Sequence, residues 1–292
     1  MTETLSLRAK IEQSPMGAYQ WMIVVMAAIM NLLDGFDVLA LAFTATAIRG
    51  EFGLTGIELG YLLSAGLFGM TAGSLFLAPL ADKIGRRPLL LMAVSLSAIG
   101  MLGSAFISQY QWLGFWRVIT GLGVGGILVG TNVITSEYSS RKWRSFAISV
   151  YAAGFGIGAV LGGMFAVMLQ GEYGWRSVFL AGAILTGLLL VVLFIWLPES
   201  IDFLTSKQPK NAEVRLNLIA KKIGLAGDWK LPAKVEKVKS KLPISQLFSE
   251  KYLHSTLLIW TAFFAIMFSF YFISSWTPAL LKEAGKIGRA HV

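Results

Sequence analysis

The sequence predicts an all-α membrane protein with seven transmembrane helices, and three observations predict it. Of the 292 residues, 55% are hydrophobic and only 14% are charged, which is outside the range of ordinary soluble domains. Seven apolar runs are each long enough to cross a bilayer as a helix. Basic residues gather in alternate connections between these runs, as they do in the cytoplasmic loops of membrane proteins.

The seven apolar runs give the elements in order. The first run is longer than the apolar region of a cleavable signal peptide and contains two acids, so we predict a retained span. The runs are Trp21–Ala47, Gly56–Leu80, Leu89–Ile107, Trp112–Thr135, Phe146–Leu169, Ser177–Leu197 and Leu253–Trp276. They predict an N-terminal segment (1–20), a six-helix transmembrane domain (21–197), a central loop (198–252), a seventh helix (253–276) and a final loop (277–292).

The net charge of +9 is placed so that it predicts membrane topology rather than nucleic-acid binding. Basic residues precede the first run and follow the second and fourth, and eleven more lie between Lys207 and Lys251. The alternate connections hold little beyond Arg49 and Arg176. By the positive-inside rule the N-terminus and the basic loops are cytoplasmic. We therefore expect a multi-pass protein of the inner membrane.

Two carboxylates lie deep in the first span. From Trp21, a helix rise of ~1.5 Å per residue places Asp34 at ~20 Å and Asp37 at ~24 Å. Both depths lie inside a hydrocarbon slab ~30 Å thick. Residues three apart share a helix face, so one wet or protein-lined surface can hold both acids. They are either a structural acid pair or part of an ion or substrate path, and intramembrane acids favour the second interpretation.

Other kinds of site find little support. The absence of cysteine excludes disulfides and thiolate metal sites, and the histidines His254 and His291 are too few and too peripheral for a metal cluster. A substrate path moves its substrate unchanged and needs no metal, cofactor or catalytic nucleophile, so we expect none of these and no enzyme. A seven-helix photoreceptor or receptor is a rival class, but the seventh span lacks a lysine for a retinal Schiff base. A ridge of Gly154, Gly158 and Gly162 suits close helix packing, and it also permits helix bending.

The loop after the second span carries a recognisable motif, which reads Ala78-Pro-Leu-Ala-Asp82-Lys-Ile-Gly85-Arg86-Arg87. It resembles the cytoplasmic loop signature of the major facilitator superfamily, Gly-x-x-x-Asp-x-x-Gly-Arg-Arg/Lys, with Ala78 in place of the first glycine. Asp82 can pair with Arg86 or cap an adjoining helix. Arg117 followed by alternating glycines is similar to the superfamily's fourth-span signature. The turn after that span resembles the family's charged turn, with Glu137, Arg141 and Arg144.

Within the superfamily, the chain most resembles the aromatic acid:proton symporters. The likeness rests on Asp34-Gly-Phe-Asp37, on Pro198–Leu204 and on Ser275–Pro278. It implies two six-helix halves, each a pair of three-helix inverted repeats, of which this chain has the N-terminal half and one further span. The implied function is proton-coupled symport of small aromatic carboxylates such as benzoate or hydroxybenzoate. A carrier of sugars or other organic anions is the alternative, and we expect the chain alone to insert without transporting.

Burial, charge and depth predict roles for the residues inside the membrane, and the resemblance implies roles for those of the cytoplasmic loops. Asp34 and Asp37 would couple transport to protons, and Arg117 with Asp37 would bind the substrate. Arg117 lies at ~22 Å on the depth scale used for the acids, so we expect it opposite Asp37, unless it snorkels to the headgroups. Asp82, Gly85, Arg86, Arg87, Glu137, Arg141 and Arg144 would gate the cytoplasmic side. The expected partners are protons, an aromatic carboxylate and the lipid bilayer, with a monomer as the expected state and no nucleic acid.

Two segments outside the spans differ in composition from the loops around them. From Ala212 to Lys241 lysines alternate with apolar residues, which predicts either amphipathic helices near anionic lipid headgroups or a solvated linker. Residues 286–292 break the character of the preceding loop, and one back-translation resembles a sequencing-library adapter. We expect them to be a foreign tail on a truncated reading frame, with a genuine short C-terminus as the alternative.

Overall fold

The computed structural model describes residues 6–232 and 244–283, and every regular element within them is a helix. Seven of these described helices are long and apolar enough to cross a membrane. The prediction of an all-α membrane protein with seven spans is confirmed. The chain divides into two compact parts, residues 1–231 and 232–292, and each is described by itself.

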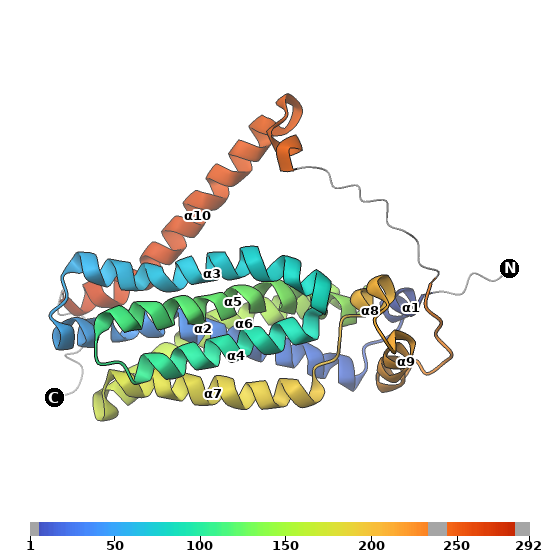
Figure 1. The fold of residues 1–292 in the computed structure, drawn as a ribbon, viewed down its shortest axis with the longest axis horizontal. Helices are drawn as coiled ribbons and strands as arrows, with labels where there is room; N and C mark the ends of the chain where they lie inside the picture. The colour runs from blue at the N-terminus through green and yellow to red at the C-terminus, as the bar shows by residue number, and fades with distance from the viewer. Residues whose placement is uncertain (1–5, 233–243, 284–292) are drawn as a thin grey trace. The chain divides into compact units, whose positions relative to one another are not determined.

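Six long helices of the first part run side by side and form a bundle (Figure 1). Each of the six coincides with a predicted span. Two of them, α4 and α7, end one or two residues before the predicted end, and the other four extend past it. Thr55 and Glu58 form a capping box that starts the second long helix at Gly56, where the predicted span also begins. The helices are α2 (Ala18–Phe52), α3 (Gly56–Ile84), α4 (Arg86–Ala105), α5 (Tyr110–Tyr138), α6 (Arg144–Tyr173) and α7 (Trp175–Trp196).

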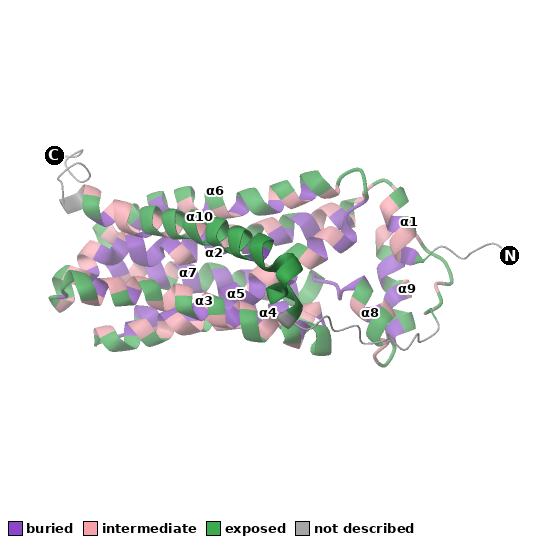
Figure 2. Ribbon diagram, turned by 90° about the horizontal axis from the view of Figure 1, so that it is seen from above, coloured by how far each residue is buried: buried purple, intermediate pink, exposed green. Residues whose placement is uncertain are grey.

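The pairing of these helices has an internal two-fold pattern. Helix α2 packs against α6, and the equivalent pair in the other repeat is α5 against α3. Likewise α4 packs against α5, and its equivalent is α7 against α2. Exchanging α2–α4 for α5–α7 therefore maps each of these pairs onto the other, as expected for two three-helix repeats. The buried residues lie mainly on the helix faces turned toward one another (Figure 2).

Close backbone contact joins α2 to α6. A Cβ added to Gly158 would overlap the carbonyl group of Leu32, and one added to Gly35 would overlap the carbonyl group of Phe155. Glycine thus lets the two backbones touch, which is the usual basis of tight helix association in membranes. Close packing against α2 therefore accounts for the glycine ridge of α6, formed by Gly154, Gly158 and Gly162.

Three short helices gather at one end of the bundle, which we call the α1/α8/α9 end (Figure 1). They are α1 (Leu7–Gln13), α8 (Ile201–Lys207) and α9 (Ala212–Ile223). Their apolar side chains, among them Leu7, Ile11, Leu204 and Leu216, join one buried cluster. The amphipathic helix predicted after Ala212 is therefore present, but protein covers its apolar face. The predicted segment continues into residues 233–243, which lie outside the described residues.

The second part contains the 3₁₀ helix η1 (Ile244–Phe248) and α10 (Glu250–Glu283). Along α10 the rings of Phe264, Phe268 and Phe272 stack at successive turns, with centroids 5.9 and 6.2 Å apart. A helix that is apolar around its whole circumference is expected in lipid or among other helices. The suspected tail at 286–292 lies outside the described residues.

Candidate functional site

The two acids of α2 are buried inside the bundle. Asp34 and Asp37 are each only 2% exposed, although α2 continues through them without a break. One turn earlier, the side-chain amide of Asn31 donates to the backbone carbonyl of Tyr151 in α6 at 2.8 Å. This bond fixes the rotation of α2 against α6 at the level of the acids. Burial of a carboxylate is costly unless hydrogen bonds or charges compensate it.

Arg117 of α5 supplies that compensation for Asp37. Its Nη1 atom lies 3.1 Å from Asp37 Oδ1 and 3.2 Å from the backbone oxygen of the same residue. The hydroxyl of Ser97 in α4 donates to the other carboxylate oxygen, Oδ2, at 2.8 Å. Both oxygens of Asp37 therefore accept a hydrogen bond. The structure brings together the two residues that the depth argument placed opposite each other.

The second nitrogen of the Arg117 guanidinium, Nη2, is also held. It donates to Thr120 Oγ1 at 2.9 Å and contacts Met101 Sδ at 3.0 Å. The guanidinium carbon lies 5.1 Å from the ring centroid of Phe179, within the range of a cation–π contact. The Nε atom is buried without a hydrogen-bond partner in the described part of the chain. Helices α2, α4, α5 and α7 thus all contact this one cation.

The environment of Asp34 is different. Its Oδ2 atom is buried and has no hydrogen-bond partner among the described residues. Asp34 interacts electrostatically with Tyr151 of α6 and with Asp37 one turn along its own helix. The two acids share a helix but not a partner, because Arg117 reaches only Asp37. They are therefore not chemically equivalent in this conformation.

Sequence reasoning did not find the residues that surround the Asp37–Arg117 pair. Ser97, Met101 and Phe179 are ordinary residues in apolar spans, and nothing in their own spacing marks them. Thr120 is the exception in principle, since it follows Arg117 by three residues and so shares its helix face. The other contacts depend on how α4 and α7 pack, which one sequence does not reveal.

The loop between α3 and α4 is reduced to one residue, Gly85, with φ of +106°. Arg86 Nη2 pairs with Asp82 Oδ1 at 2.7 Å, as considered from the sequence. The backbone N–H groups of Arg86 and Arg87 donate to Glu199 Oε1 at 2.8 and 3.0 Å. Glu199, rather than Asp82, therefore caps the start of α4. A Cβ on Gly85 would overlap this carboxylate.

The charged turn after α5 makes different contacts. Glu137 accepts hydrogen bonds from the Ser200 hydroxyl at 2.9 Å and from the Ile201 backbone N–H at 2.8 Å, which caps α8. Arg144 Nη2 lies 2.6 Å from Glu12 Oε1, and the Arg141 N–H donates to the Glu12 backbone oxygen at 2.9 Å. The hydrogen bond from Arg144 lowers the pKa of Glu12 below its ordinary value.

The segment after α7 connects these two groups of predicted gating residues. Glu199 binds the loop between α3 and α4, and the next residue, Ser200, binds Glu137. The Tyr138 hydroxyl also donates to the Glu199 backbone oxygen at 2.6 Å. Arg8 of α1 pairs with Asp202 of α8. Glu199 lies in Pro198–Leu204, which the sequence marked as a family feature, but no role was predicted for it.

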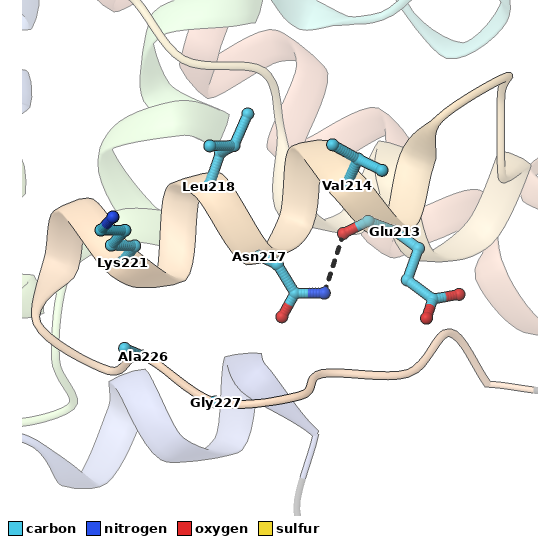
Figure 3. A pocket seen from close by; sticks show the side chains of 7 residues that line it. All are labelled: Glu213, Val214, Asn217, Leu218, Lys221, Ala226 and Gly227. Carbon is cyan, nitrogen blue, oxygen red and sulfur yellow. Dashed lines mark hydrogen bonds between the residues drawn. The ribbon is translucent and has the colours of Figure 1, made fainter.

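Two other kinds of site were considered in the described part of the chain, a metal-binding group and a surface pocket. Within residues 6–232 and 244–283, no cluster of three or more His, Cys, Asp or Glu side chains could hold a metal ion. A shallow pocket of about 620 Å³ lies beside α9 (Figure 3). Its polar side chains are Glu213, Asn217 and Lys221, none of which belongs to α2 or α5.

A bundle of bilayer-length helices with charged residues buried at mid-helix is typical of a multi-pass membrane transporter. The model of the Major Facilitator Superfamily matches residues 27–286, and the chain belongs to that family.

Several curated relatives carry names that specify a substrate. The chain is 34% identical to the gallate transporter of Pseudomonas putida over 94% of the chain and 61% of the relative. It is 32% identical to the 4-hydroxybenzoate transporter of the same organism over 97% of the chain and 64% of the relative. The likeness to aromatic acid transporters that the motifs indicated is confirmed at the level of sequence. The chain spans less than two thirds of the length of these relatives.

Solved structures of the superfamily share the fold. The xylose transporter XylE of E. coli, in a partially occluded inward-open conformation, matches with a TM-score of 0.62 at 22% identity. That match covers 69% of this chain and 55% of XylE. A bacterial homologue of the human lysosomal transporter Spinster matches with a TM-score of 0.66 at 18% identity, over 94% of this chain and 58% of the homologue.

Proposed function

We propose that the full-length protein containing this chain imports small aromatic carboxylates together with protons across the bacterial inner membrane. The observation that carries the proposal is the buried pair of Asp37 and Arg117. The names of the gallate and 4-hydroxybenzoate transporters support the substrate class. The protein moves its substrate unchanged, so the site needs no catalytic group.

The pair provides a way to couple the two bindings. While Asp37 is charged it holds Arg117, and the Nη1 and Nη2 atoms of the guanidinium are both occupied by protein partners. Protonation of Asp37 removes that charge and releases Arg117, whose planar donors match a substrate carboxylate. Neutralising one charge also avoids an electrical cost of ~2.3 kcal/mol per 100 mV during the transition. Asp34 is the second proton-coupling residue in this proposal.

The α1/α8/α9 end is the proposed cytoplasmic gate. Its orientation follows from the basic residues that gather there in the sequence. Asp82, Gly85, Arg86 and Arg87 belong to one group of contacts, and Glu137, Arg141 and Arg144 to the other, with the segment at Glu199 between them. In this proposal the contacts fix the cytoplasmic ends of α3, α4, α5, α6 and α8 in one arrangement. The domain boundaries drawn from the sequence, with the chain as an N-terminal half plus one helix, are part of this proposal.

Uptake by the full-length protein tests the proposal. Cells or proteoliposomes would take up labelled 4-hydroxybenzoate under an inward proton gradient, and a protonophore should abolish accumulation. Benzoate, gallate, xylose and an aliphatic dicarboxylate form the comparison panel. Accumulation of xylose or the dicarboxylate in preference to the aromatic acids would contradict the assigned substrate class. In Asp37→Asn and Asp34→Asn variants we expect accumulation to be lost, and its survival in both would contradict the coupling role.

A further inference from the structure

Ser97 stands out among the hydroxyl groups of α4. Ser95 Oγ donates to the Leu91 carbonyl at 2.7 Å, and Ser104 Oγ donates to the Gly100 carbonyl at 2.8 Å. Both bonds run to the preceding turn of the same helix, which is how serine in a helix usually satisfies its hydroxyl. Ser97 Oγ instead donates to Asp37 Oδ2 on α2 at 2.8 Å. The bond is fully enclosed, because Ser97 and Asp37 are each 2% exposed.

A close approach of α4 to α5 puts Ser97 in this position. A Cβ added to Gly123 of α5 would overlap the Ala93 carbonyl oxygen and approach the Ser97 backbone nitrogen to 2.7 Å. Only glycine allows the two backbones to come this close. The same packing carries Met101, one turn further along α4, to the Arg117 guanidinium. Ser97 and Arg117 therefore reach the same carboxylate from neighbouring helices.

We propose that Ser97 is a positioning residue for proton coupling, which holds the ionised Asp37 carboxylate in line with Arg117. The inference rests on the proposed function, since it concerns the same acid. Asp37 Oδ1 faces Arg117, and Ser97 occupies the other oxygen, so the carboxylate cannot rotate away from the guanidinium. A hydrogen bond to a charged acceptor is about twice as strong as one between neutral groups, so Ser97 stabilises the ionised form most.

Few charged or titratable groups face Asp37, which makes the contribution of Ser97 measurable. Arg117 approaches from α5, and Asp34 lies one turn away on α2, where it interacts electrostatically with Tyr151 of α6. The α4 and α7 residues at the pair, Ser97, Met101 and Phe179, do not titrate in the working range. Removing the Ser97 hydroxyl therefore changes the local hydrogen bonding without changing the charge count.

The test compares Ser97→Ala with Ser104→Ala in the full-length protein. Ser104 is equally buried on the same helix but bonds only to its own backbone, so its variant controls for the loss of a buried hydroxyl. We expect the pH of half-maximal 4-hydroxybenzoate uptake to rise by about one unit in Ser97→Ala. It should stay unchanged in Ser104→Ala, and Ser97→Thr should restore the original profile.

A second measurement separates this inference from the proposed function. Infrared difference spectroscopy of the purified 292-residue chain follows the C=O band of a protonated carboxylic acid during acidification, with Asp37→Asn to assign the band. The midpoint of that band should rise in Ser97→Ala whether or not the protein transports aromatic acids. An unchanged midpoint would overturn the role of Ser97. If the wild-type full-length protein shows no proton-dependent uptake but the midpoint still rises in Ser97→Ala, only the proposed function is overturned.

Discussion

Arg117 Nη1 lies 3.1 Å from Asp37 Oδ1, and the two side chains are only 4% and 3% exposed. The bond joins α2 to α5, which are the first helices of the two three-helix repeats. A buried pair of this kind adds little net stability compared with apolar residues, but losing one partner costs about 3–5 kcal/mol because the other charge stays uncompensated. The two partners differ in one respect: a carboxylate can take up a proton, whereas an arginine stays charged.

This asymmetry predicts unequal effects of single substitutions. Asp37→Asn leaves a buried cation and should lower the free energy of unfolding by about 3 kcal/mol, while Arg117→Gln should cost less. The double variant should recover part of the loss, with a coupling energy of about 2 kcal/mol. Detergent titration of the purified chain, followed by circular dichroism, measures these values. Asp34→Asn combined with Arg117→Gln is the matched control, and we expect coupling below about 0.5 kcal/mol there.

The contact between α2 and α6 gives a second prediction. Gly158→Ala would place a methyl group on the Leu32 backbone and should destabilise the bundle by about 1–3 kcal/mol. Gly156 of the same helix has no atom within 4 Å of an added Cβ, so Gly156→Ala should change stability by less than about 1 kcal/mol. The same unfolding assay measures both variants. Equal effects would show that the glycine ridge does not mediate close packing.

The sequence predicted the spans and the position of Arg117 opposite Asp37 because both depend on length and depth along a helix. It did not predict Ser97 as a partner of Asp37, because that contact depends on the rotation of α4 and on its close approach to Gly123. It also missed Glu199, although the residue lies in a segment noted for its family likeness. Capping of α4 by a residue 113 positions away is a tertiary contact that local patterns do not encode.

The loop between α3 and α4 gives a third prediction, which rests on the proposed gate. Asp82→Asn or Arg86→Gln in the full-length protein should change the turnover rate several-fold while substrate affinity stays within about twofold. Both residues lie at a helix end, away from the buried acids of α2, so they cannot coordinate a bound carboxylate. Equilibrium binding and initial uptake rates distinguish the two effects. A large loss of binding in a folded variant would contradict a gating role.

The contact of Glu12 with Arg144 predicts a pH-dependent attachment of α1. The hydrogen bond from Arg144 lowers the pKa of Glu12 below its ordinary value of 4.5. A carboxyl group with a lowered pKa contributes stability above its ordinary pKa, and that contribution is lost as the pH falls through the lowered value. Acidification below about pH 4.5 should therefore loosen the attachment of α1 to the bundle. Its side chains Leu7 and Ile11, which are buried in the structure, would then become more exposed.

Hydrogen exchange of the 7–13 segment, corrected for the intrinsic pH dependence of exchange, measures this loosening. In the wild-type chain, protection of α1 should fall as the pH drops below the ordinary pKa of Glu12. In Glu12→Gln, protection should already be lower at pH 7, and its further loss on acidification should be smaller. Equal acid profiles in wild type and Glu12→Gln would show that the bond to Arg144 does not hold α1 in place.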